Sequence, residues 1–157
     1  SVGRKISEDF LENYDLYGNF YNGYSVIDER GICPENWHVP TNNDWEILAD
    51  FIGGMINGGG KLKETGYLHW NNPNIGATNQ TGFTAMASGG ILEATIDGTT
   101  KKALIDTKQR AYFWTSSQYN MERLFIQKLD FDSGIFASHS NQALKMSNGM
   151  SIRCIQD

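Results

Sequence analysis

The sequence predicts an α+β domain with an antiparallel sheet. One segment with clear helical spacing lies in the first third of the chain, and several short strand-like segments bounded by Gly, Asn, Asp or Ser fill the second half. A parallel sheet would need strands and helices to alternate along the chain, and these segments do not alternate. Since 157 residues with 12% aromatics can build one core, we expect one domain over residues 1–157, in which residues 1–20 could form an N-terminal appendage.

The clearest element is one early helix over residues 41–52. Thr41 can cap it, and Asp44 three residues later can complete a capping box. The apolar residues that recur at helical spacing are Trp45, Leu48, Ala49 and Ile52. Gly53 and Gly54 are expected to end the helix, because glycine adopts the left-handed conformation at little cost.

The rest of the N-terminal half is less regular. Residues 7–14 begin with a Ser cap and acidic side chains, which favours a short helix, and residues 17–26 alternate aromatics with Gly and Asn, as a strand with a turn does. Residues 57–60 are predicted to form a glycine-rich turn. Residues 70–82 consist almost entirely of turn formers, so we expect a long structured loop there.

Six short strands are predicted in the second half of the chain. Each is rich in β-branched or aromatic residues and is bounded by turn formers. They cover residues 83–86, 90–96, 111–115, 123–131, 135–138 and 151–155.

Charge and hydropathy exclude two classes of partner. The formal net charge is −5 and the 13 Lys and Arg residues are dispersed, so no basic stripe is present to neutralise a nucleic-acid backbone. No apolar run approaches the roughly 20 residues that a bilayer span requires. We therefore expect neither a nucleic-acid partner nor a transmembrane segment in this chain.

The two cysteines, Cys33 and Cys154, lie near opposite ends of the chain. This separation excludes CxxC redox and zinc-ribbon spacings. It leaves two interpretations, a disulfide that closes a very long loop or two buried free thiols. A disulfide would imply an oxidising compartment.

Three segments carry a family resemblance: GICPENWHVPTNNDWEIL at 31–48, KLKETGYLHWNNPNIGATNQTGFTAM at 61–86 and SNGMSIRCIQD at 147–157. Together they closely resemble the Fibrobacter succinogenes major paralogous domain family. FWTSSQY at 113–119 resembles the tryptophan-serine-serine segment of that family. The family is in turn similar to the formylglycine-generating, sulfatase-modifying group, whose arginine-leucine-proline-threonine-x-x-x-tryptophan helix start resembles HVPTNNDW here.

The resemblance implies a C-type-lectin-like fold. In that fold the N- and C-terminal strands pair and long central loops form the recognition face, which supports a disulfide between Cys33 and Cys154. The motif residues have structural interpretations: Thr41 as a cap, Arg153 as a partner of a carboxylate or of loop carbonyls, and as core residues Trp37, Val39 and Trp45.

The sequence contains no assembled catalytic set. An enzyme of the formylglycine-generating type needs a reactive cysteine pair or a copper site, and a disulfide would consume both cysteines. We expect His38 to be packed and hydrogen-bonded, and His69 and His139 to lie in loops or on the surface, because they are widely spaced. Ser116 and Ser117 lack a GxSxG context. We therefore expect no enzyme activity and no cofactor.

Calcium is the most serious metal hypothesis. Oxygen ligands are plentiful in the central loop, but none of them is a carboxylate, so binding would be weak. The alternative is that these side chains hydrogen-bond the loop's own backbone. The residues are Asn71, Asn72, Asn74, Thr78 and Asn79.

Aromatic rings beside amides and hydroxyls can stack on sugars or peptides and give direction to hydrogen bonds. The candidate ligand-binding residues are Trp70, Asn71, Asn74, Trp114, Gln118, Tyr119, His139 and Asn141. Either tryptophan could instead belong to the core.

These patterns predict a non-catalytic recognition module that binds a glycan or protein ligand through its loop face. We expect it outside the cell or at the cell surface, with the periplasm as a further compartment, after removal of an export signal or lipid anchor. A structural or assembly component of a bacterial surface complex is the alternative, and an enzyme of the formylglycine-generating type is the third.

Overall fold

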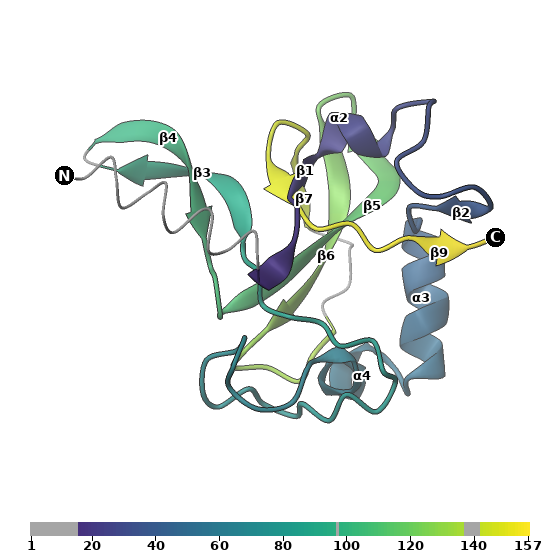
Figure 1. Ribbon diagram of the computed structural model, residues 1–157, viewed down its shortest axis with the longest axis vertical. Coiled ribbons are helices and arrows are strands. Elements are labelled where there is room, and N and C mark those ends of the chain that lie inside the picture. The colour runs from purple at the N-terminus through teal and green to yellow at the C-terminus, as the bar shows by residue number, and fades with distance from the viewer. Residues whose placement is uncertain (1–15, 97, 137–141) are drawn as a thin grey trace.

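The computed structural model describes residues 16–96, 98–136 and 142–157. These residues form a mixed α and β structure with few helices (Figure 1). In chain order the elements are β1 (Tyr21–Asn22), α2 (Gly23–Val26), β2 (Trp37–His38), α3 (Asn42–Phe51), α4 (Met55–Leu62), β3 (Gly90–Ile96), β4 (Thr99–Ile105), β5 (Arg110–Asn120), β6 (Arg123–Asp130), β7 (Ala143–Lys145), β8 (Gly149–Met150) and β9 (Ile155–Gln156).

The strands form three small sheets. One has the order β1-β8-β3-β4, a second has the order β5-β6-β7, and β2 pairs with β9. Every pairing between these strands is antiparallel, which confirms the antiparallel prediction. In Figure 1 the β3–β4 hairpin extends to one side, while α4 and the long loop that follows it lie at the opposite end of the molecule from α2.

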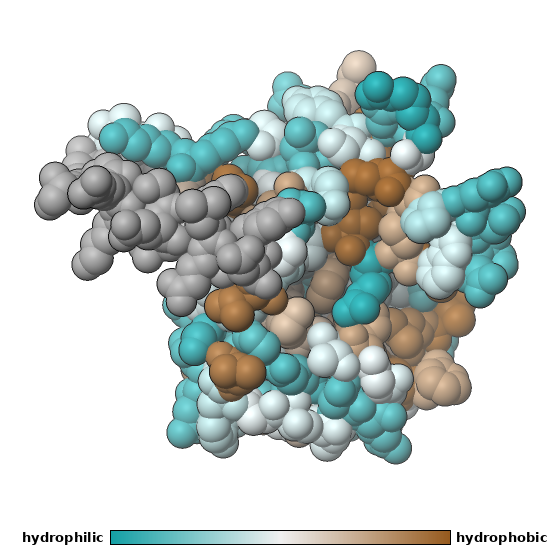
Figure 2. Space-filling model, viewed as in Figure 1, coloured by the Kyte–Doolittle hydropathy of each residue, from teal (hydrophilic) through white to brown (hydrophobic). Residues whose placement is uncertain are grey.

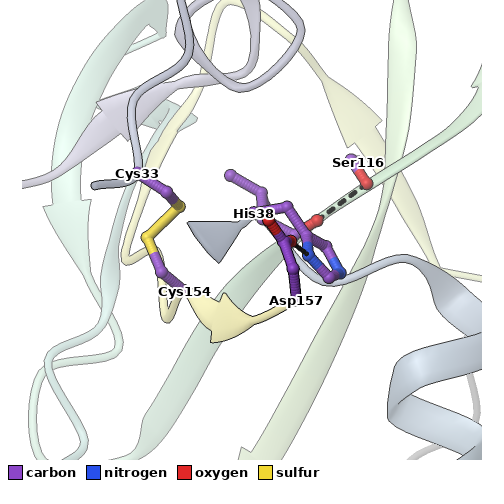
Figure 3. Close-up of a disulfide and its surroundings, with 6 residues drawn as sticks. Cys33, His38, Ser116, Cys154 and Asp157 are labelled. Atoms are coloured by element: carbon purple, nitrogen blue, oxygen red, sulfur yellow. Dashed lines mark hydrogen bonds and ion pairs between the residues drawn. A yellow bond between two sulfur atoms is a disulfide. The ribbon is translucent and has the colours of Figure 1, made fainter. Parts of the chain in front are cut away.

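The early strands pair with the last strands of the chain. Tyr21 lies opposite Met150 in the β1–β8 pair, and His38 lies opposite Ile155 in the β2–β9 pair. Cys33 and Cys154 form a disulfide with a sequence separation of 121, so the disulfide interpretation is confirmed and that of free thiols is wrong. Figure 3 shows this bond close to His38 and Asp157. The disulfide indicates an oxidising compartment.

The predicted early helix is confirmed as α3, with Thr41 and Ile52 as its caps. The Thr41 hydroxyl accepts from the Asp44 backbone N–H at 3.3 Å, and the Asp44 carboxylate accepts from the Thr41 N–H at 2.8 Å, which is the expected capping box. The predicted apolar face is buried at Trp45 and Ala49. Beyond Ile52, two glycines with φ of 92° and 91° turn the chain out of the helix.

The predicted glycine-rich turn at 57–60 is wrong, because these residues lie inside α4. Local propensity disfavours glycine within a helix, but Gly58, Gly59 and Gly60 are buried against other backbone and side chains. A Cβ on Gly60 would collide with the carbonyl of Gly76, and one on Gly59 would come within 2.8 Å of the Gly134 carbonyl oxygen. Close tertiary packing therefore selects glycine in this helix.

Two predicted strands agree well with the structure and one agrees in part. Residues 90–96 form β3, and residues 123–131 correspond to β6. Residues 111–115 lie within the longer β5. The strands β4 and β7 were missed, although the Asp97-Gly98 dipeptide before β4 is a recognised hairpin signal.

The other predicted strands need correction. Residues 83–86 form no strand because Thr84 has a φ of 53°, which breaks the extended backbone. Ile135 and Phe136 are not in a strand, since their N–H groups donate to the Ser133 hydroxyl and the Met55 carbonyl. Residues 137 and 138 lie outside the described residues.

The predicted strands near the two ends of the chain are shorter in the structure than expected. In the 151–155 segment, Ser151 makes an isolated bridge to Phe113 and Ile155 opens β9. In the 17–26 segment the strand is only β1, because Asn22 caps α2 with its side chain. The predicted helix at 7–14 lies outside the described residues.

The core consists of two apolar clusters. One lies under α3 and α4 and includes Trp45, Leu62 and Phe136. The other includes Val39 and lies under α2, where it contains Tyr112 and Trp114 of β5. Trp45 and Val39 are buried as predicted, but Trp37 is 43% exposed because the two-stranded β2–β9 sheet offers little to cover it. Within the described segments, no helix is long and apolar enough to cross a bilayer.

Lys63 anchors the long loop after α4. It has no exposed surface, and its ammonium donates to the carbonyls of Asp130 at 2.9 Å and Ser133 at 3.0 Å. The ammonium also lies 5.2 Å from the centre of the Trp70 ring. Burial lowers the pKa of Lys63 to about 8, although the charges of Asp130 and Asp132 oppose this effect.

Removing the disulfide should strongly destabilise the domain. In the chain-entropy model, a bond with a sequence separation of 121 contributes about 5 kcal/mol by restricting the unfolded chain. We expect the Cys33→Ser/Cys154→Ser variant to lose unfolding free energy of that order in urea titration. Reduction of the wild-type protein should give the same loss, and unchanged stability in both cases would contradict this role.

The buried Lys63 should make stability rise with pH. The folded state releases this proton near pH 8, whereas the unfolded chain keeps it until about pH 10.4, so between these values the unfolded state binds more protons. The wild-type unfolding free energy should therefore rise by up to about 1.4 kcal/mol per pH unit relative to Lys63→Met. Comparing the two proteins cancels the opposite contributions of Tyr17 and Tyr112, whose pKa burial raises. Parallel pH profiles would refute the prediction.

Candidate functional site

The two tryptophans in the predicted ligand-binding set are core residues. Trp70 and Trp114 have no exposed surface. Their indole N–H groups donate to the carbonyls of Ala85 at 2.9 Å and Tyr21 at 2.8 Å. Asn74 is also buried, and its amide donates to the carbonyls of Glu64 and Gly66. Trp70 and Trp114 therefore belong to the core, which was the alternative interpretation, whereas Asn74 also lines a cavity of about 350 Å³ together with Pro73 and Thr78.

Asn71 lies far from Gln118 and Tyr119. Asn71 is exposed, and its backbone N–H donates to Lys108, just before β5 begins. Gln118 and Tyr119 are exposed near the other end of this strand, about 30 Å away at the usual rise per residue. His139 and Asn141 lie outside the described residues. Asn71 therefore does not share a site with Gln118 and Tyr119, and ligand binding by these residues stays a prediction.

The structure draws attention instead to Arg153, which lies between two cavities. One cavity, of about 220 Å³, is lined by Tyr17, Thr84, Met86, Ser88, Phe113, Ser151, Ile152 and Arg153. The other, of about 280 Å³, is lined by Pro40, Asp44, Trp45, Leu48, Phe83, Arg153, Cys154 and Ile155. We call the two cavities together the Arg153 cleft. In Figure 2, apolar residues gather where the C-terminal segment crosses the front of the molecule, with polar residues directly beside them.

The Arg153 guanidinium is held in place by Phe83. Its Nη2 donates to the Phe83 carbonyl at 2.8 Å, and its central carbon lies 4.5 Å from the centre of the Phe83 ring. This confirms the expectation that Arg153 binds a loop carbonyl. The next residue, Thr84, has the unusual φ of 53°, and Asn79 holds it with hydrogen bonds of 2.8 and 2.9 Å.

Within the described part of the chain, no acidic group neutralises the charge of Arg153. No ion pair links it to an acidic group among the described residues. Loss of hydration lowers the pKa of Arg153, but a guanidinium stays charged at neutral pH. Asp44 is the one acidic residue among those that line the cleft, and its carboxylate is bound to Thr41 and His38.

Hydroxyl groups surround the smaller cavity. The Ser88 and Ser151 hydroxyls lie 3.3 Å apart, and Ser88 is almost fully buried. The Tyr17 hydroxyl is buried and has no hydrogen-bond partner among residues 16–96, 98–136 and 142–157, which is uncommon in folded proteins. Burial, with a further contribution from Glu64, raises the pKa of Tyr17, so its hydroxyl stays protonated as a donor.

The Tyr17 ring packs against a partly buried hydrogen-bonded pair. Its centre lies 5.4 Å from that of the His69 ring, and His69 Nδ1 lies 2.8 Å from a Glu64 carboxylate oxygen. The His69 side chain is 13% exposed and lies in the loop after α4, which agrees with the expectation of a loop or surface histidine. This packing fixes one wall of the smaller cavity.

The backbone around Arg153 is fixed from both sides. Cys154 is bonded to Cys33, and Ser151 forms a bridge to Phe113 in β5. Beyond the disulfide, His38 Nδ1 lies 2.6 Å from Asp157, as Figure 3 shows. Hydrogen bonds to Asp157 and Asp44 raise the pKa of His38. The predicted hydrogen bonding is confirmed, but the His38 side chain is 41% exposed and so is less packed than expected.

The candidate catalytic and metal residues have structural partners. Ser116 donates to the Val39 carbonyl (Figure 3), and the Ser117 hydroxyl accepts from the Asn42 N–H. Among residues 16–96, 98–136 and 142–157, no three His, Cys, Asp or Glu side chains are grouped so that they could hold a metal ion. In the central loop, the amides of Asn74 and Asn79 bind the loop itself. Calcium binding by Asn71, Asn72 and Thr78 stays a prediction.

Sequence reasoning missed Arg153 as a functional residue, and it missed Tyr17, Ser88 and Ser151 entirely. One signal was present: Arg153 precedes a cysteine, so a disulfide would fix its position. The sequence does not show that Arg153 lacks an acidic partner among the described residues, because this depends on the tertiary structure.

Comparison with known proteins places the chain in one family. The Fibrobacter succinogenes major domain matches residues 4–156. No curated protein and no solved structure matches the chain. Because the match covers nearly the whole sequence, the chain belongs to the Fibrobacter succinogenes major domain family.

Proposed function

We propose that this chain is a non-catalytic recognition module that binds a protein or glycan ligand in the Arg153 cleft. The observation that carries the proposal is a charged, solvent-accessible guanidinium with no acidic partner among the described residues, placed between two cavities. An exposed guanidinium with no carboxylate partner is available to pair with an acidic group of a ligand.

A C-type-lectin-like scaffold is part of this proposal. The pairings β1–β8 and β2–β9 bring the two ends of the domain together, as such a scaffold requires. Between α4 and β3 a long irregular segment is fixed by Lys63 and by the buried Trp70. Part of this segment, at Phe83 and Thr84, forms a wall of the cleft.

The proposed location is outside the cell or at its surface, with the periplasm as a further compartment. The disulfide supports an oxidising environment. In such a place the cleft would be accessible to ligands from neighbouring cells or from the surrounding medium.

The second candidate is a structural or assembly component of a bacterial surface complex. It is favoured by exposed apolar side chains on neighbouring helices: Ile47 is 60% exposed and Phe51 82% exposed on α3, and Ile56 is 74% exposed on α4. Exposed apolar patches commonly mark protein contacts. The third candidate, an enzyme of the formylglycine-generating type, is disfavoured because both cysteines are consumed in the disulfide.

Peptide and glycan arrays test the recognition function. We expect the wild-type protein to bind a defined set of probes and Arg153→Gln to bind them at least about tenfold more weakly, as for loss of a charge-assisted hydrogen bond. Arg30→Gln is the matched control, since its guanidinium is 89% exposed and pairs with Asp28. Thermal melting checks that both variants fold. Silence on both arrays would rule the function out.

Purification from the native cell envelope tests the assembly function. We expect the protein to co-purify with a fixed neighbour, and the double variant Ile47→Lys/Phe51→Lys to lose it because charges would be buried at the contact. Met121→Lys is the control, being 93% exposed at the β5–β6 turn. Retention of the neighbour by the double variant would exclude this surface.

A further inference from the structure

We propose that the Arg153 cleft binds the C-terminal carboxylate of a peptide whose last side chain is apolar. The carboxylate would pair with Arg153 beside the smaller, hydroxyl-lined cavity, and the last side chain would fill the larger, apolar cavity. This inference rests on the proposed function and names the ligand chemistry for it.

The Arg153 guanidinium has N–H donors that the hydrogen bond to Phe83 does not use. Arginine carries five N–H donors in a planar fork, and Phe83 accepts from one of them. The fork matches the two oxygens of a carboxylate, which gives both strength and direction. Stacking on the Phe83 ring at 4.5 Å restricts the plane of the fork before a ligand arrives.

Hydroxyl donors can complete the carboxylate site. Ser88, Ser151 and Tyr17 line the same cavity as Arg153. Among the described residues the Tyr17 hydroxyl has no hydrogen-bond partner, although it is buried in this conformation, and Ser151 is partly exposed. A site for one carboxylate needs one cation with neutral hydrogen-bond donors around it. The smaller cavity provides Arg153 and these hydroxyl groups.

A carboxylate suits the cleft better than a phosphate group. Arg153 is the one cationic residue among those that line the two cavities, and the whole chain carries a formal net charge of −5. A phosphate monoester carries up to two negative charges at neutral pH. One arginine balances one carboxylate and would leave a phosphate partly unbalanced.

The larger cavity favours a peptide end over an acidic sugar. It is lined mainly by Pro40, Trp45, Leu48, Phe83 and Ile155, and its volume of about 280 Å³ accommodates an aliphatic or aromatic side chain. A sugar acid carries hydroxyl groups around its ring, and these would lack partners against such a wall. In a C-terminal residue, an apolar side chain and a carboxylate leave the same carbon atom, as the adjacent cavities require.

Paired peptide arrays test this inference on the wild-type protein. One array displays octapeptides with free C-termini, the other displays the same octapeptides as C-terminal amides, and both vary the last residue. We expect free acids ending in Leu, Ile, Val or Phe to bind at least about tenfold more tightly than their amides. Arg153→Gln should lose this preference, while Arg30→Gln should keep it.

The possible outcomes separate this inference from the proposed function. Equal binding of acids and amides would refute the proposal that the cleft binds a C-terminal carboxylate, but it would leave the proposed recognition function intact. Binding restricted to uronic-acid oligosaccharides on the glycan array would refute the proposal that the ligand is the end of a peptide. Silence on every array would overturn both proposals. The acid and amide comparison needs no substitution, so it holds even if Arg153→Gln fails to fold.

Discussion

The covalent joining of Cys33 to Cys154 is the constraint on which the rest of the structure depends. It lies beside the β2–β9 pair, and the β1–β8 pair makes a second connection between early and late segments. The strands β1, β2, β8 and β9 have only two residues each, so their hydrogen bonds alone would hold the early and late segments together weakly. The disulfide adds a covalent connection between these segments. Arg153 adjoins this bond, so the most constrained part of the fold also carries the candidate site.

The cleft concentrates features that do not favour stability. Among the described residues, Arg153 has no acidic partner and the Tyr17 hydroxyl has no hydrogen-bond partner. Thr84 has a φ of 53° that β-branched residues rarely adopt. Elsewhere the described charges are better matched, as in the Arg110 pairs with Asp106 and Asp130. Locally unfavourable features that occur together are typical of functional sites, where ligand binding can compensate for them.

The sequence predicted those parts of the fold that local interactions determine. The capping box of α3 and the turn formers that bound β3 are short-range signals, and both elements formed as expected. The glycines of α4 gave the opposite local signal, because their helix depends on contacts with distant backbone. The site was less predictable for the same reason. Trp70 suits a core and a binding surface equally well, and the isolation of Arg153 depends on which residues the fold leaves distant from it.

The pairing of early and late strands also determines when this domain can fold. The partners of β1 and β2 are β8 and β9, so a growing chain cannot complete either pair until residues 149–156 have been made. Contacts between residues so far apart in the sequence form slowly, because the entropic cost of closing a long loop comes before the free energy gained from the contact. The joining of the early and late segments is therefore expected to be a late step in the folding of this domain.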